Sequence, residues 1–251
     1  MKAVGVNKCF IAIEENKPDA IEIVQKQVAN EQGIKVATLV TKYPQGDEKR
    51  LINAVTGREV PSGGLPMDVG VVVNNVGTAA TIGKVIKTGM PVVERVVTVT
   101  GSAIKQPKNL MVKIGTSFEE IIEQCGGFSE DPGKIVSGGP MMGIAQYTTN
   151  VPVIKGTSGI LVLNKKDAER PEPVNCIRCG KCVNICPVNL QPLMISRLSL
   201  LGKYDEAEGY NALDCIECGS CSFICPSKRP LVDAIRVAKR EIIAKRRKAS
   251  K

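Results

Sequence analysis

Eight of the ten cysteines fall in two runs that share one spacing, "CIRCGKCVNICP" at 176–187 and "CIECGSCSFICP" at 215–226. Each run has three cysteines at steps of three residues, then a fourth cysteine that is followed directly by proline. Zinc and iron–sulfur clusters are the metal groups that bind many thiolates. Structural zinc usually takes two separated Cys-x2-Cys pairs, whereas three closely spaced cysteines suit one face of a cubic cluster. We therefore predict two [4Fe–4S] clusters, with two zinc ions or disulfides as the alternatives.

The fourth cysteine of each run lies too far along the chain to complete the cluster of its own run. In two-cluster ferredoxins this cysteine ligates the other cluster. A glycine follows the second cysteine of each run, Gly180 and Gly219, and lets the backbone approach the cluster closely. The predicted ligands of cluster 1 are Cys176, Cys179, Cys182 and Cys225, and those of cluster 2 are Cys186, Cys215, Cys218 and Cys221. The isolated Cys9 and Cys125 are interpreted as small core residues.

Composition excludes several other kinds of chemistry. The 251 residues include no histidine, which rules out Cys/His zinc sites and Rieske-type ligation and removes the commonest general base. No apolar run is long enough to span a membrane and the N-terminal residues do not resemble a secretory signal, so we expect a cytoplasmic protein with reduced thiols. The formal net charge of +9 falls to about +5 if each cluster with its thiolates contributes about −2. With four Tyr and four Phe, the chain offers no stacking platform for nucleic acid.

The elements that must position these cysteines follow from the local patterns. Residues 8–40 are predicted to form strand, helix and strand, a βαβ unit with a parallel sheet, and Gly- and Asn-rich loops follow. From about residue 92, alternating strands surround one helix that starts with a Ser117/Glu120 capping box, which predicts a small mixed sheet grasping a helix. A polar, Pro-containing linker at 164–175 leads into a mainly helical region that holds both cysteine runs in its loops. The predicted fold class is thus α/β plus α+β.

Over its whole length the sequence resembles the C subunit of the membrane-bound Rnf electron-transport complex, a ferredoxin:NAD oxidoreductase. Its middle is also similar to the flavin-bearing subunit of respiratory complex I. The segments that carry the resemblance are "YPQGDEKRLI", "VPSGGLP", "VVVNNVGTAA", "GGPMMG" and the two cysteine runs. The resemblance implies a partial Rossmann-like flavin/NADH-binding domain at 1–90, a β-grasp (SLBB-type) ligand-binding domain at 91–165 and a helical dicluster ferredoxin domain at 166–251.

The resemblance to the complex I subunit also implies a set of residues that contact flavin mononucleotide (FMN). They are Tyr43, Gly46, Asp47, Glu48, Asn74, Asn75 and Thr78. In the family, a Gly-rich phosphate and nicotinamide loop and a further domain precede the segment at which this sequence begins. We therefore expect a partial chain that starts inside the flavin domain. FMN and NAD(H) would be bound by the full-length protein, and these 251 residues alone would bind FMN weakly or not at all.

The function that the resemblance implies is that of an electron-transfer subunit in an ion-translocating ferredoxin:NAD oxidoreductase. Such a subunit would lie on the cytoplasmic face of the membrane without a transmembrane segment of its own, with ferredoxin and the other subunits as partners. It would relay electrons through two clusters and would need no catalytic acid or base, which agrees with the absence of histidine. The alternatives are a flavin- and cluster-dependent protein like cobalamin reductase, or a cluster-bearing binding or sensing module.

Overall fold

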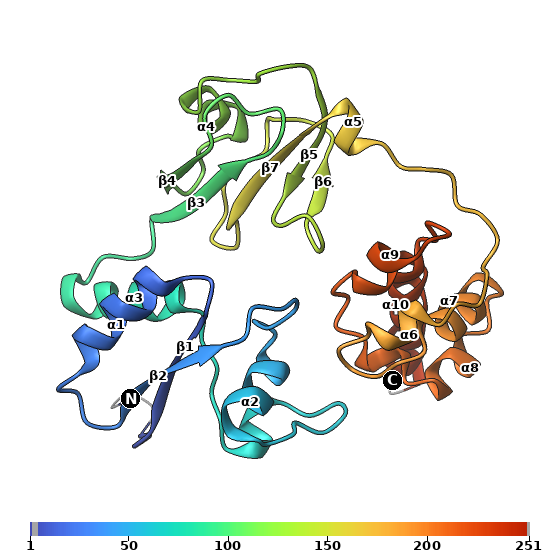
Figure 1. Ribbon diagram of the computed structural model, residues 1–251, viewed down its shortest axis with the longest axis horizontal. Coiled ribbons are helices and arrows are strands. Elements are labelled where there is room, and N and C mark those ends of the chain that lie inside the picture. The colour runs from blue at the N-terminus through green and yellow to red at the C-terminus, as the bar shows by residue number, and fades with distance from the viewer. Residues whose placement is uncertain (2–4, 250–251) are drawn as a thin grey trace. The chain divides into compact units, whose positions relative to one another are not determined.

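The computed structural model describes residue 1 and residues 5–249. The chain divides into two compact units, Met1–Lys84 and Val85–Lys251. Figure 1 labels the helices and strands of both. None of the helices in the described residues is both long and apolar enough to cross a lipid bilayer.

The first unit is built on the predicted βαβ arrangement. Strand β1 (Cys9–Glu14) and strand β2 (Ile34–Leu39) pair in parallel, in a register that runs from Cys9 opposite Ile34 to Glu14 opposite Leu39. Helix α1 (Pro18–Val28) connects them and has proline in its first turn, where the missing N–H leaves no helical bond unmade. The parallel pairing confirms the prediction for this segment.

The remainder of this unit consists of helices separated by turns. Helix α2 (Glu48–Thr56) and the 3-10 helix η2 (Pro66–Val69) precede helix α3 (Val76–Thr88), which continues across the boundary between the two units. Among the described residues of this unit, Ile52 on α2 is the one hydrophobic side chain that is fully buried, at 2 % exposure. The unit therefore gains little stability from a hydrophobic core of its own.

The second unit begins with a five-stranded mixed sheet in the order β4-β3-β7-β5-β6. The central pair β3–β7 is parallel and the other pairs are antiparallel. The strands are β3 (Glu94–Thr100), β4 (Lys108–Lys113), β5 (Pro132–Ser137), β6 (Ile144–Gln146) and β7 (Gly159–Asn164). Sequence patterns did not predict β6, which has only three residues, too few for an alternation to be visible.

One helix packs on this sheet, as predicted. Helix α4 (Phe118–Gln124) starts with the expected capping box: the Ser117 hydroxyl accepts from the Glu120 N–H, and the Glu120 carboxylate accepts from the Ser117 N–H, both at 3.2 Å. Phe118 and Ile121 are buried against sheet residues such as Val99. Cys125 belongs to the same core, which confirms its interpretation as a core residue.

The C-terminal part of the second unit is helical, in agreement with the sequence. Its longest helix, α10 (Leu231–Ala249), buries one face against α7 (Pro192–Leu200) and α8 (Tyr204–Gly209). On α10 the residues Ile235, Ala238 and Ile242 recur at three- and four-residue steps, the spacing of a buried helical face. The remaining elements are short: α5 (Lys165–Ala168), α6 (Lys181–Asn184), η3 (Ala212–Asp214) and α9 (Ser220–Ile224).

Candidate metal centre

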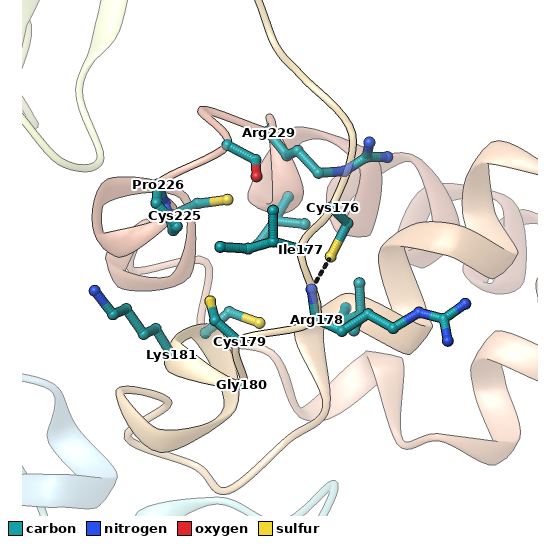
Figure 2. Close-up of a pocket in the computed structure, with 13 residues that line it drawn as sticks. Cys176, Ile177, Arg178, Cys179, Gly180, Lys181, Cys225, Pro226 and Arg229 are labelled. Carbon is teal, nitrogen blue, oxygen red and sulfur yellow. Dashed lines mark hydrogen bonds between the residues drawn. The ribbon is translucent and has the colours of Figure 1, made fainter.

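Four cysteines drawn from both runs line one cavity, which we call cavity 1. Cys176, Cys179 and Cys182 come from the first run, and Cys225 comes from the second. Figure 2 shows the side chains of Cys176, Cys179 and Cys225 arranged around the same hollow. These are the four residues that the sequence predicted together for cluster 1.

A second hollow, cavity 2, has the complementary set of cysteines. Its walls include Cys215, Cys218 and Cys221 of the second run together with Cys186 of the first. The two hollows are similar in size, ≈ 350 Å³ and ≈ 340 Å³ with open solvent included. Helix α10 contributes an apolar wall to each, Leu231 in cavity 1 and Ile235 in cavity 2.

Two hydrogen bonds help to hold Cys225 beside the first run. The segment before Cys176 is tied to the loop after Cys225: the Val174 N–H donates to the Ser227 carbonyl at 3.1 Å, and the Ser227 hydroxyl donates to the Asn175 carbonyl at 3.0 Å. Ser227 is buried, so water competes little for these bonds. Sequence reasoning missed Ser227, although its place two residues after the last cysteine of the second run was visible.

The two runs adopt the same backbone conformation. The residue directly before the second cysteine and the glycine directly after it have positive φ in both runs. The values are 56° and 73° at Arg178 and Gly180, and 57° and 81° at Glu217 and Gly219. This conformation points an amide at a sulfur, because the Arg178 N–H donates to Cys176 Sγ and the Glu217 N–H donates to the sulfur of Cys215, both at 3.4 Å. Amide hydrogen bonds to sulfur stabilise thiolate ligands and help to set the potential of a cluster.

The thiols that influence one another electrostatically also come from both runs. Burial, and then the neighbouring cysteines Cys215, Cys218 and Cys186, raise the pKa of Cys221 to about 12. Burial raises the pKa of Cys182 as well, and Cys225 adds to that increase. Without a bound metal group these thiols are protonated at neutral pH, and ligation would release their protons.

An ionic network holds the second run against α10. The Glu217 carboxylate contacts Lys239 Nζ at 2.7 Å and Arg236 Nε at 3.0 Å, and Lys239 also donates to the Cys215 carbonyl at 2.6 Å. Burial alone would raise the pKa of Glu217, but the two cations outweigh it and hold that pKa below its usual value. Glu217 is therefore a paired anion beside cavity 2.

The donor chemistry of both cavities fits a [4Fe–4S] cluster. Each cavity offers four thiols, apolar walls, and backbone N–H groups directed at sulfur, which are the features that such clusters use. The grouping of the cysteines in the two cavities supports the predicted ligand sets, which stay a prediction until a cluster is measured in each.

The residues that the resemblance implied for FMN lie at the starts of two helices of the first unit. Tyr43 and Gly46 precede α2, Glu48 is its first residue, and the Asp47 carboxylate caps it by accepting from the Arg50 N–H at 3.2 Å. Asn74 and Asn75 precede α3, Thr78 lies in its first turn, and Asn75 Oδ1 accepts from the Gly77 N–H at 2.9 Å. Helix starts suit a phosphate because their N–H groups are unpaired, but FMN contact by these residues stays a prediction.

Three protein-family models match successive parts of the chain. The Nuo51 FMN-binding domain matches residues 1–84, the SLBB domain matches 96–145, and the 4Fe-4S dicluster domain matches 168–226. The chain thus carries an FMN-binding domain, an SLBB domain and a 4Fe-4S dicluster domain, as the resemblance implied.

Curated proteins from several bacteria are similar to the chain. It is 59% identical over 250 residues to the C subunit of the Na(+)-translocating ferredoxin:NAD(+) oxidoreductase complex of Acetobacterium woodii, matching 100% of this chain and 56% of the relative. It is 54% identical to the C subunit of the proton-translocating ferredoxin:NAD(+) oxidoreductase complex of Clostridium ljungdahlii, over 96% of this chain and 53% of the relative. Identity to the C subunit of the ion-translocating oxidoreductase complex of Rhodobacter capsulatus is 44%, over 78% of this chain and 38% of the relative. The chain spans about half the length of the first two relatives.

Proposed function

We infer that this chain is an electron-transfer subunit of an ion-translocating ferredoxin:NAD oxidoreductase complex, because it is homologous along its whole length to the C subunits of such complexes. The observation that carries this inference is the pair of cavities, each lined by four cysteines from both runs. A bound [4Fe–4S] cluster supplies one-electron transfer. The cysteines would hold it, and the amides of residues such as Arg178 and Glu217 would stabilise its sulfur ligands.

The remaining parts of the proposal follow from the matched domains. Residues 1–90 would contribute to FMN and NAD(H) binding, 91–165 would form the SLBB-type domain, and 166–251 would hold both clusters. The partners would be ferredoxin and the other subunits of the complex, and the chain would lie on the cytoplasmic face of the membrane. In this function the chain carries electrons and performs no acid–base catalysis.

Metal and sulfide analysis after anaerobic reconstitution tests the proposal. We expect about eight iron and about eight acid-labile sulfides per chain, and two electron paramagnetic resonance (EPR) signals after reduction. Two zinc ions without sulfide would overturn it. Anaerobic cofactor assays separate the alternatives, because a protein like cobalamin reductase would reduce cobalamin, whereas a sensing module would have clusters with potentials well above the ferredoxin range.

A further inference from the structure

The turn "GGPMMG" at 138–143 is not among the segments that line either cavity. It joins the antiparallel strands β5 and β6 of the five-stranded sheet. The Gly143 N–H donates to the Gly139 carbonyl at 2.8 Å, and this hydrogen bond closes the turn. Strand β6, although short, therefore returns the chain so that Met141 and Met142 lie at the end of a hairpin.

Met141 lies against the second cysteine run, and both belong to the second compact unit. The residue that it touches is Gly219, which follows Cys218 and lines cavity 2. A Cβ on Gly219 would lie 2.8 Å from the Met141 carbonyl oxygen and 3.7 Å from Cε of the same methionine. The first distance is too short for a carbon–oxygen contact, so a glycine at 219 is what allows the turn to approach this closely.

The first run has no such neighbour, although its backbone is the same. Gly180 holds the equivalent place, with a φ of 73° against 81° at Gly219. A Cβ on Gly180 would meet no atom of the described chain within 4 Å. The exposure of the preceding cysteines differs in the same direction, since Cys179 is exposed and Cys218 is only 7 % exposed. The less exposed of the two loops is thus the one that the turn touches.

The helices around the cavities do not account for this difference. Each cavity takes one apolar residue from the first turn of α7 and one from the first turn of α10, namely Leu193 with Leu231 in cavity 1 and Pro192 with Val232 in cavity 2. The ion pairs of Glu217 with α10 also distinguish the second run. A test of the turn must therefore leave those ion pairs in place.

We propose that the turn at 138–143 is a cover for cavity 2, in which Met141 is a positioning residue that keeps water away from the second cysteine run. The inference rests on the proposed function, because it needs a cluster in cavity 2, and it gives the sheet of the second unit a part in electron transfer. Reduction adds one electron to a cluster and no proton, so the reduced state is the more negative one. Water stabilises that state, and a shielded cluster therefore has a lower potential than an exposed one.

Methionine suits this role for a physical reason. Its side chain is unbranched and polarisable, so it can follow an irregular backbone surface such as that of a cluster loop. Met141 is half-buried, whereas its neighbour Met142 is 49 % exposed. The two methionines of the turn are therefore a natural pair of test and control.

The first test is a redox titration of the reconstituted holo chain with dithionite, followed by EPR. Met141→Ala removes the thioether but leaves the cysteines and the Glu217 ion pairs unchanged. We expect the potential of the cavity 2 cluster to rise and that of the cavity 1 cluster to stay at its parent value. Cys221→Ala identifies the signal of cavity 2. Met142→Ala should shift neither potential, and Met141→Leu, which fills a similar volume, should restore most of the parent value.

The second test measures access directly, as iron release from the oxidised holo chain to an iron chelator under anaerobic conditions. Met141→Ala should lose the cluster of cavity 2 roughly 3- to 10-fold faster than the parent chain, because the covering contact no longer opposes local opening. The cluster of cavity 1 should be lost at the parent rate. EPR of the remaining reduced protein shows which signal has decreased.

A pair of glycine variants tests the same contact without changing a methionine. Gly219→Ala and Gly180→Ala impose a similar cost of positive φ on their loops, but the alanine at 219 also meets the Met141 carbonyl. Relative to the same cluster in the parent chain, we expect Gly219→Ala to speed iron release from cavity 2 more than Gly180→Ala speeds it from cavity 1.

Four results would overturn the cover. The first is Met141→Ala with both potentials and both release rates of the parent chain. The second is an equal shift of both clusters in Met141→Ala, which would make Met141 a general support of the fold. The third is a failure of Met141→Leu to restore the potential, and the fourth is an equal effect of the two glycine variants. In all four cases the proposed function stands, whereas a parent chain that assembles no clusters would refute the proposed function itself.

Discussion

At the scale of single residues, the cysteines that line each cavity could be grouped from the sequence, because their spacing and the proline after the fourth cysteine are typical of two-cluster ferredoxins. The spacing does not indicate which other residues surround each set of four cysteines. Lys239 lies more than twenty residues after Glu217 and Cys215 in the sequence, and only the folded chain brings it to the Glu217 carboxylate and the Cys215 carbonyl. The sequence also shows that the first run has Arg178 where the second has Glu217. The structure adds that these two residues have the same backbone conformation, so they occupy equivalent places in the two loops.

The predicted ligand sets, each drawn from both runs, imply a specific effect of Cys186→Ala. This change should leave the cluster of cavity 1 assembled and remove one ligand from cavity 2, so its EPR spectrum should resemble that of Cys221→Ala. The matched comparison is Cys176→Ala, which should affect the other signal. A spectrum of Cys186→Ala that matches Cys176→Ala instead would show that each run holds its own cluster.

At the scale of elements, the sequence predicted those whose ends are marked by local chemistry. The helix α4 was located by its Ser117/Glu120 box, and α1 by its early proline. Strand β6 was missed because three residues are too few to show the alternation of apolar and polar side chains that identifies a strand. Its place at the sheet edge depends on pairing with β5. Asp47 was proposed as an FMN contact, and the structure shows that it also caps α2, a role that its position before a helical segment could have suggested.

The capping box predicts a measurable loss for Ser117→Ala. Removing the hydroxyl leaves the Glu120 N–H without its acceptor, and the free energy of opening of α4 should fall by about 1 kcal/mol. Hydrogen exchange of the α4 amides measures this quantity. Ser117→Asp keeps an acceptor at the same place and should differ from the parent by only a few tenths of a kcal/mol; an equal loss in both variants would contradict the role of the cap.

At the scale of the whole molecule, hydrophobic burial is unevenly distributed between the two units. The sheet and α4 share a core that includes Val97, Phe118 and Val162, whereas Ile52 is the fully buried apolar side chain in the described part of the first unit. The sequence did not reveal this difference, because β1 and β2 are as apolar as β3 and β7. Burial depends on what packs against a strand, and a two-stranded sheet is marginal when little covers it.

This distribution predicts the order of unfolding. In the 251-residue chain, amides of β1 and β2 should exchange with solvent well before those of β3 and β7, because local opening costs least where few apolar contacts are lost. Hydrogen exchange followed by mass spectrometry resolves the two sheets in a single experiment. Equal protection of both sheets would mean that the first unit is stabilised by something other than its own buried side chains.

The crossing of the two runs also has a consequence for how the protein is made. Cavity 1 takes its last cysteine, Cys225, from the end of the second run, and the last cysteine to be added to cavity 2 is Cys221. With the predicted ligand sets, the first run leaves the ribosome before the cysteine that completes its set has been synthesised. The two sets are then completed only four residues apart. A nascent chain that stalls between the two runs would expose cysteine thiols and could complete neither set of four. We therefore expect iron and sulfide to be delivered after both runs have been translated.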